Sequence, residues 1–393
     1  MHSLPAARIE TLPLDVLRRR RTEKWNAYPS DVLPAWVAEM DFAVAPSIAV
    51  VLREVAQDND FGYPLSRAKR EVAECFVERM QHRFTWAVRE ERVEVLSDVV
   101  QGLYLCLAAF SRPGDGVVIQ PPIYPPFLGS VSEMKRRAVL RPLHPFEGGW
   151  GIDWAQLEDD AARTARLVLL CNPHNPTGRV FQRTELERLA ELALDRNWLV
   201  VSDEIHADLT YPDNVFIPFG SLAPEVAERT ITLTSATKAF NIPGLRCAVA
   251  YFGSDQLWQR FNDAFPRHLR GGLSVPGLRA TASAWKDAQA WLDELVRVLD
   301  QNKQLLLDSV SRDLQGLSIR APEATYLAWL DCTRLALPTS PARFFLDNAK
   351  VALSDGRHFG AGFEQFVRLN FATSRSLLTE ILQRMRQALA QRR

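Results

Sequence analysis

The stretch Thr230-Ile231-Thr232-Leu233-Thr234-Ser235-Ala236-Thr237-Lys238-Ala239-Phe240-Asn241 decides how this chain of 393 residues is interpreted. Its first part, residues 230–234, is rich in β-branched and apolar side chains and predicts a buried strand. Ser235 and Thr237 follow, and then Lys238. A lone lysine is usually solvated. Burial beside the end of a strand lowers the pKa of a lysine, which makes it a nucleophile and a base. The stretch therefore predicts a reactive lysine.

Further polar side chains follow other predicted strands. Residues 167–171 form a short apolar run of the kind that is buried on both faces of a parallel sheet, and Asn175 follows them. Asp203 follows the hydrophobic residues 198–202. In such sheets, ligands bind at the carboxyl ends of the strands. An amine, a carboxylate and an amide at that edge suit pyridoxal 5′-phosphate (PLP). The amine forms the Schiff base, the carboxylate keeps the pyridine nitrogen protonated and the amide binds the ring hydroxyl.

Other residues are expected to complete the contacts with the cofactor ring and the substrate. Tyr124 comes after a predicted strand and is expected to stack on the ring. His206 is expected to reach the ring side or to orient Asp203, and a purely structural role stays open. Arg368 lies among apolar neighbours in the strand-like residues 366–370. An arginine there requires an anion, and a substrate carboxylate fits its planar fork.

The phosphate is expected at the start of a predicted helix over residues 99–110. The backbone amides of Val99 and Val100 would bind it, because the first amides of a helix have no partner within the helix. Ser235 would add a hydroxyl and Arg246 a positive charge. The side chain of Asp98 is expected to turn away as the cap of the helix.

Strands alternating with helices predict an α/β fold, a mostly parallel sheet of the seven-stranded type sandwiched by helices, with a smaller α+β domain. We predict an arm over 1–47 that contributes to the small domain, a large domain over 48–285 and the small domain over 286–393. Residues 1–45 are expected to be extended. A long helix near 277–311 is expected to bridge the domains.

Composition limits the function classes. Lys+Arg and Asp+Glu are both 47, so there is no electrostatic case for nucleic acid. No apolar run approaches the ~20 residues of a membrane span. The five cysteines lack CxxC spacing and are expected to be reduced core thiols, not a disulfide frame or a metal site. The N-terminus lacks the apolar run of a signal peptide, so we expect a cytoplasmic protein.

The chain resembles fold-type I PLP enzymes of the class I/II aminotransferase family along nearly its whole length. The residues that carry the resemblance occur in the family's order: Tyr124, Asn175, Asp203, Ser235, Lys238, Arg246 and Arg368. Within the family it is most similar to the bacterial cystathionine β-lyase (C–S lyase) branch, on residues 33–42, 61–63, 202–208, 238–244 and 325–331. Aminotransferases proper usually have a tyrosine at the position of His206. The chain departs from the family at Leu96-Ser97-Asp98, where many relatives have a glycine.

The resemblance implies a homodimer with active sites at the interface, in which Tyr63 reaches the phosphate of the partner subunit's cofactor. It also implies that Trp36 and Tyr326 belong to the substrate site. The expected activity is cleavage of L-cystathionine or related cysteine S-conjugates to a thiol, pyruvate and ammonia, with Lys238, Asp203 and Tyr124 as catalytic residues. Two alternatives stay open: an aminotransferase with the same site, and an added regulatory role in which the fold binds a transcription factor.

Overall fold

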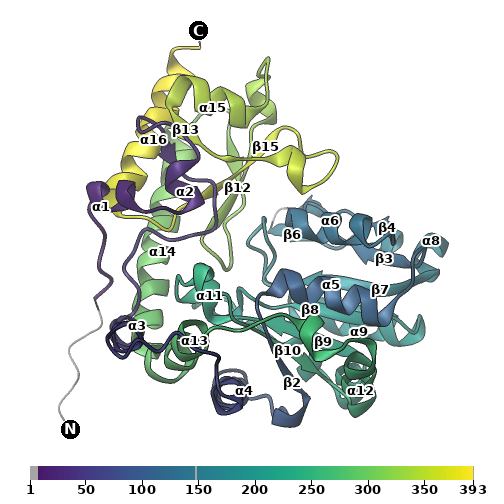
Figure 1. The fold of residues 1–393 in the computed structure, drawn as a ribbon. Helices are drawn as coiled ribbons and strands as arrows, with labels where there is room; N and C mark the ends of the chain where they lie inside the picture. Colours follow the sequence, from purple (N-terminus) through teal and green to yellow (C-terminus); the bar gives the residue numbers. More distant parts are fainter. Residues whose placement is uncertain (1–7, 147, 393) are drawn as a thin grey trace.

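A seven-stranded sheet forms the centre of the larger part of the computed structural model, which describes residues 8–146 and 148–392 (Figure 1). The strands lie in the order β2-β10-β9-β8-β7-β3-β4. Strand β10 is antiparallel to both of its neighbours, and the remaining neighbours are parallel. The predicted mostly parallel sheet is therefore confirmed. The strands are β2 (Val93–Leu96), β3 (Gly116–Ile119), β4 (Arg137–Leu140), β7 (Ala165–Cys171), β8 (Leu199–Asp203), β9 (Thr230–Thr234) and β10 (Ala248–Phe252).

Helices cover both faces of this sheet because its central strands are apolar on both sides. In β7, Leu167 and Leu169 belong to one buried cluster, together with side chains of α5, α6 and α12. Val168 and Leu170 belong to another cluster, with side chains of α9. The face of β2 and β10 that carries Val95 packs with α4 and α13. These helices are α4 (Ser66–Phe84), α5 (Val99–Phe110), α6 (Pro125–Glu133), α9 (Arg183–Asp195), α12 (Asp255–Ala264) and α13 (Val275–Asp287).

The smaller part is built on an antiparallel sheet in the order β11-β12-β15-β14. The N-terminal arm joins this part, because β1 (Leu33–Pro34) pairs with β13 (Val351–Ala352). Figure 1 shows the arm in purple beside the yellow C-terminal helix α16. The predicted domain boundaries stay predictions. The elements here are β11 (Ser318–Ile319), β12 (Leu327–Asp331), β14 (Ser354–Asp355), β15 (Phe366–Asn370), α14 (Gln289–Arg312), α15 (Pro341–Ala349) and α16 (Arg375–Ala390).

The short elements lie around these layers. A hairpin of β5 and β6 follows the edge strand β4, and α11 directly follows β9. None of the described helices is long and apolar enough to cross a bilayer. The five cysteines are buried and unpaired, as expected. The bounds are β5 (His144–Phe146), β6 (Gly149–Gly151), α3 (Pro46–Gln57), α7 (Trp154–Leu157), α8 (Asp160–Arg163), α10 (Pro224–Ala227) and α11 (Ala236–Ala239).

Two expectations about local structure are wrong. The first 45 residues are not simply extended, because they contain α1 (Leu14–Arg19) and α2 (Glu23–Asn26). Helices this short give no clear periodicity, and tertiary contacts stabilise them. The predicted helix near 277–311 is interrupted at Ala288, where α13 ends and α14 begins. The chain changes direction there because α13 packs on α3 and α4, whereas α14 extends to the small part.

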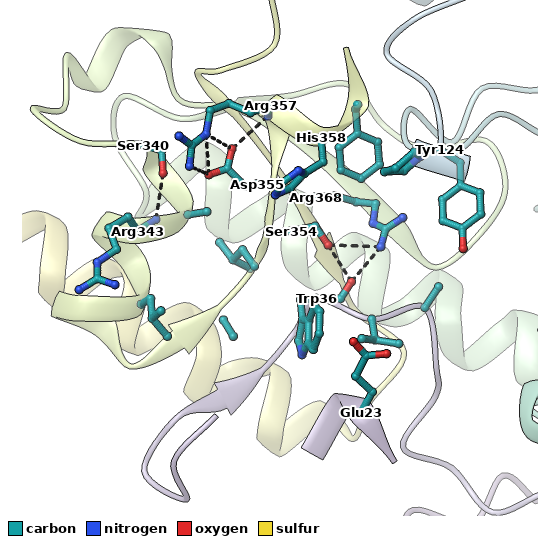
Figure 2. A pocket seen from close by; sticks show the side chains of 18 of the residues that line it. Glu23, Trp36, Tyr124, Ser340, Arg343, Ser354, Asp355, Arg357, His358 and Arg368 are labelled. Carbon is teal, nitrogen blue, oxygen red and sulfur yellow. Dashed lines mark hydrogen bonds and ion pairs between the residues drawn. The ribbon is translucent and has the colours of Figure 1, made fainter. Parts of the chain in front are cut away.

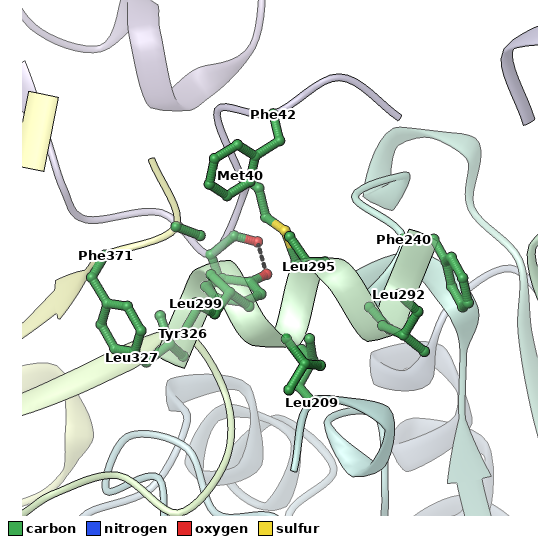
Figure 3. Close-up of a cluster of buried hydrophobic side chains, with 14 of the residues drawn as sticks. Met40, Phe42, Leu209, Phe240, Leu292, Leu295, Leu299, Tyr326, Leu327 and Phe371 are labelled. Atoms are coloured by element: carbon green, nitrogen blue, oxygen red, sulfur yellow. Dashed lines mark hydrogen bonds between the residues drawn. The ribbon is translucent and has the colours of Figure 1, made fainter. Parts of the chain in front are cut away.

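A buried cluster around α14 joins the arm to both parts of the molecule (Figure 3). Met40 and Phe42 come from the arm, Phe240 from the large part and Tyr326 from the small part, and all four are fully buried. The hydroxyl of Tyr326 donates to the Ala38 carbonyl oxygen at 3.0 Å. The cluster therefore fixes the arm segment that reaches the strand ends.

Candidate active site

Two adjoining cavities lie where the arm, the sheet edge and the small part meet. The inner cavity, of about 510 Å³, is lined by residues 97–101, Asn175, Asp203 and His206. The outer cavity, of about 570 Å³, extends toward the small part and is lined by residues that include Arg368 (Figure 2). Ala38, Tyr124 and Lys238 line both cavities. Lys238 therefore lies at the junction of two compartments.

Lys238 reaches this junction because it lies on α11, which begins directly after β9. Its Nζ donates to the Ala38 carbonyl oxygen at 3.0 Å. Burial, assisted by the charge of Arg368, lowers the pKa of Lys238 to about 8. An amine with this pKa is partly neutral near physiological pH, as a nucleophile and base requires.

Asp203 is the last residue of β8 and is buried in the wall of the inner cavity. Its Oδ1 accepts a hydrogen bond from the Ile205 amide at 3.1 Å. Burial raises the pKa of Asp203 to about 7, although this amide and Lys238 oppose the rise. A carboxylate in this position is stabilised by a cation that enters the cavity.

His206 is buried beside Asp203 and also lines the inner cavity. Burial and the charges of Lys238 and Arg368 lower its pKa to about 3, so the ring is neutral. Its Nδ1 has no hydrogen-bond partner in the described part of the chain. A buried polar atom without a partner indicates a place for a ligand group.

Asn175 and Tyr124 also line the inner cavity and are hydrogen-bonded to each other. The Tyr124 amide donates to the Asn175 carbonyl oxygen at 3.1 Å. The Asn175 side-chain oxygen accepts from Nη1 of Arg368 at 3.0 Å. This leaves the amide nitrogen of Asn175 as the group that can donate to a ligand. Burial raises the pKa of the Tyr124 hydroxyl.

Arg368 is a buried cation without an anion. It is 5% exposed, and Nη2 donates to the Trp36 carbonyl oxygen at 2.9 Å and to Ser354 Oγ at 3.2 Å (Figure 2). Among the described residues it has no carboxylate partner, and its Nε has no hydrogen bond. Burial lowers its pKa to about 10. A carboxylate that enters the outer cavity would supply the missing negative charge.

The first residues of α5 form another part of the wall of the inner cavity. Within the described residues the amides of Val99 and Val100 have no hydrogen-bond partner. Asp98 caps the helix as expected, because its Oδ1 accepts from the Gln101 amide at 2.7 Å, but it does not turn away from the site, since it lines the inner cavity. Its other oxygen pairs with Arg246 Nη2 at 2.5 Å. Two amides and one arginine in this part of the wall can bind a phosphate.

Ser235 is not part of the cavity wall. Its Oγ donates to the Cys247 carbonyl oxygen at 2.6 Å and accepts from the Thr237 amide at 3.0 Å, so it caps α11. Thr237 lines the inner cavity in its place. The sequence-based prediction named Ser235 as the hydroxyl residue that contacts the phosphate, but Thr237 is the one that lines the cavity.

Comparison with known proteins places the chain in a family. The family model of class I and II aminotransferases matches residues 25–385. The chain belongs to this family.

Several relatives within the class I and II aminotransferase family are lyases by name. Cystathionine beta-lyase of Corynebacterium glutamicum is 34% identical, with 95% of this chain and 98% of the relative covered. Cystathionine beta-lyase PatB of Bacillus subtilis is 35% identical, with 92% and 93% covered. The crystal structure of cystalysin from Treponema denticola, which contains PLP, has a TM-score of 0.89 at 28% identity and covers 96% of this chain and 98% of its own.

Three further residues that the family resemblance implied lie in different surroundings. Trp36 lines the outer cavity. Tyr326 lines neither cavity, and its hydroxyl instead binds the Ala38 carbonyl that also accepts from Lys238. Tyr63 is fully exposed and lies outside both cavities. Its expected role in a partner subunit's site stays a prediction.

The inner cavity of this class I and II aminotransferase family member fits PLP by its own donors and acceptors. It offers a buried amine, a buried carboxylate whose pKa is raised, a histidine nitrogen without a partner and free amides at a helix start. The amine matches the aldehyde of PLP, the carboxylate and the histidine match its ring, and the amides match its phosphate. Sequence reasoning missed much of the outer wall, because its members come from distant segments that carry no shared pattern. They include Glu23, Tyr28, Arg343, Ser354 and Arg357.

Proposed function

We propose that the protein is a PLP-dependent carbon–sulfur β-lyase that cleaves L-cystathionine or related cysteine S-conjugates to a thiol, pyruvate and ammonia. One observation carries the proposal. The buried amine of Lys238 lies at the junction of a cavity suited to PLP and a second cavity that holds the unpaired cation of Arg368. The named cystathionine β-lyases among the relatives support it.

The inner cavity would bind the cofactor and the outer cavity would bind the substrate. When bound, PLP supplies an electron sink that makes the Cα proton of an amino acid acidic. Lys238 would hold its aldehyde carbon, Asp203 would keep a proton on the pyridine nitrogen and Asn175 would donate to the ring oxygen. The α5 amides and Arg246 would bind the phosphate.

The remaining steps belong to Arg368 and Lys238. Arg368 binds the substrate carboxylate and so fixes which bond at Cα faces the lysine. Once the substrate amine has replaced Lys238 at the aldehyde carbon, the freed amine of Lys238 would remove the Cα proton and then protonate the sulfur as the bond between Cβ and sulfur breaks. A pKa of about 8 keeps both forms of the amine available near neutral pH. The remaining three-carbon fragment takes up water and gives pyruvate and ammonia.

The test mixes PLP-loaded protein with L-cystathionine and no keto acid. Steady release of pyruvate and thiol over many turnovers, with the cofactor absorbance unchanged, supports a β-lyase. Conversion of the cofactor in a single turnover, without thiol, would show an aminotransferase instead. The Lys238→Ala variant is expected to lose all turnover. Retained lyase activity in this variant would contradict the role assigned to Lys238.

We also propose a homodimer with shared active sites, which the full exposure of Tyr63 outside both cavities supports. Inactive Tyr63→Ala and Lys238→Ala subunits, unfolded and refolded together, should recover roughly a quarter of the original activity, because mixed dimers hold one intact site. No recovery in verified mixed dimers would contradict sharing.

A cytoplasmic location is proposed as well, since the five buried thiols are unpaired. Cell fractionation tests it.

A further inference from the structure

The arm forms one wall of the outer cavity with an acid and two aromatic rings. Glu23 is the first residue of α2, and its side chain lines the cavity together with Tyr28 and Trp36 (Figure 2). The rings of Tyr28 and Trp36 lie edge to face, with centroids 5.5 Å apart. The Trp36 indole donates to the Lys24 carbonyl oxygen at 3.3 Å, which fixes its orientation. A carboxylate beside aromatic rings is the environment that binds an ammonium group.

The negative charge of Glu23 is not neutralised by the cations that line the same cavity. In the described part of the chain Glu23 has no ion pair, although Arg343 and Arg357 contribute to the opposite wall. Arg343 is already paired with Asp347 at 2.6 Å, and Arg357 with Asp355 at 2.8 Å. Glu23 therefore remains available for a cation that enters the cavity.

The position of Glu23, Tyr28 and Trp36 relative to the reacting groups indicates which cation Glu23 would bind. Arg368 and Lys238 line the outer cavity too. An amino acid with its carboxylate on Arg368 and its Cα at Lys238 has its sulfur substituent in this cavity. The end of that substituent can then meet the wall of Glu23, Tyr28 and Trp36.

We propose that Glu23, supported by Tyr28 and Trp36, binds a distal ammonium group on the leaving thiol. The residue thereby selects cysteine S-conjugates with a positively charged amine at the far end, a class that includes L-cystathionine. This inference rests on the proposed β-lyase function and names the substrate class of the same site.

The experiment compares two substrates that differ only in the distal amine, L-cystathionine and S-(3-carboxypropyl)-L-cysteine. Because Glu23 is exposed, kcat/KM of the Glu23→Gln variant for L-cystathionine should fall about fivefold, the upper scale of an exposed ion pair, while kcat/KM for the second substrate stays within about twofold. Glu191→Gln, on the exposed face of α9 and outside both cavities, is the matched control and should leave both values unchanged.

Equal losses of kcat/KM on both substrates would show that Glu23 has only a structural role. Unchanged kcat/KM on both substrates would show that Glu23 does not meet the distal amine. Either result overturns the inference. Dissociation constants of the two compounds, measured in the Lys238→Ala background with and without Glu23→Gln, give the same comparison without turnover. If the original enzyme releases no pyruvate, the proposed function fails, and these binding constants still decide the inference.

Discussion

Replacing Arg368 with methionine is expected to stabilise the cofactor-free protein and to remove most of its activity. Burial lowers the pKa of Arg368 from 12.5 to about 10. Because this pKa is lower in the folded chain than in the unfolded one, holding the charge costs on the order of 3 kcal/mol at every pH below about 10. Methionine removes this cost.

The substitution also breaks hydrogen bonds, which reduces the gain. The Trp36 carbonyl oxygen keeps a donor, because Ser354 Oγ binds it at 2.9 Å. The side-chain oxygen of Asn175 loses its partner, at a cost of about 1 kcal/mol. The net gain is about 2 kcal/mol, which raises the unfolding midpoint of a chain of this size by about 2 °C.

Thermal unfolding of the cofactor-free variant at neutral pH measures this gain, and kcat/KM for L-cystathionine measures the loss of activity. We expect kcat/KM to fall on the order of a hundredfold, because the substrate carboxylate loses a charge-assisted fork. Arg386→Met is the control, since Arg386 is exposed on α16 and its ion pair with Asp313 is long, at 3.9 Å. A lower midpoint for Arg368→Met would refute the argument that the buried charge destabilises the fold. Unchanged kcat/KM would refute its role in substrate binding.

Two further predictions concern the lysines. Only the neutral amine attacks an aldehyde, and the pKa of Lys238 is lowered to about 8, so the rate of PLP uptake by cofactor-free protein should rise with pH and level off above about pH 8. Absorbance measures this rate, and a rate independent of pH below that value would contradict the prediction. Lys24→Met should destabilise the protein by about 3 kcal/mol or more, because it leaves the carboxylate of Asp41, which lies 2.8 Å from Lys24 Nζ, buried without its cation. Urea unfolding measures this, and Lys24→Met/Asp41→Asn should recover part of the loss; an unchanged transition in the single variant would contradict the argument.

The sheet and the inner cavity were predictable because each signal is local. Residues 230–234 form a strand over the predicted range, since apolar β-branched runs allow few other structures. Asp203 ends one strand and Lys238 comes soon after another, and neighbouring parallel strands bring their ends to one edge. Local order in the chain thus predicts proximity in space.

The outer cavity was not predictable because it depends on contacts between distant segments. Glu23 and Arg357 share this cavity, yet their segments meet only through the fold, with β1 pairing to β13. No local pattern shows that Ala288 interrupts a helical stretch, since the break follows from two helices packing on different neighbours. The choice between Ser235 and Thr237 depends on where α11 begins, which a sequence defines poorly.

The attachment of the arm has a consequence for how substrate range can change in such enzymes. The wall that contains Glu23, Tyr28 and Trp36 precedes, along the chain, every residue assigned to the chemistry. The arm pairs with the small part through the backbone of Leu33 and Pro34, and Arg368 binds the arm through the Trp36 carbonyl oxygen, so these two contacts do not depend on which side chains the arm carries. The preference for one leaving thiol over another can therefore change among relatives, or be transferred by exchanging the N-terminal arm. The catalytic residues at the strand ends stay unchanged in either case.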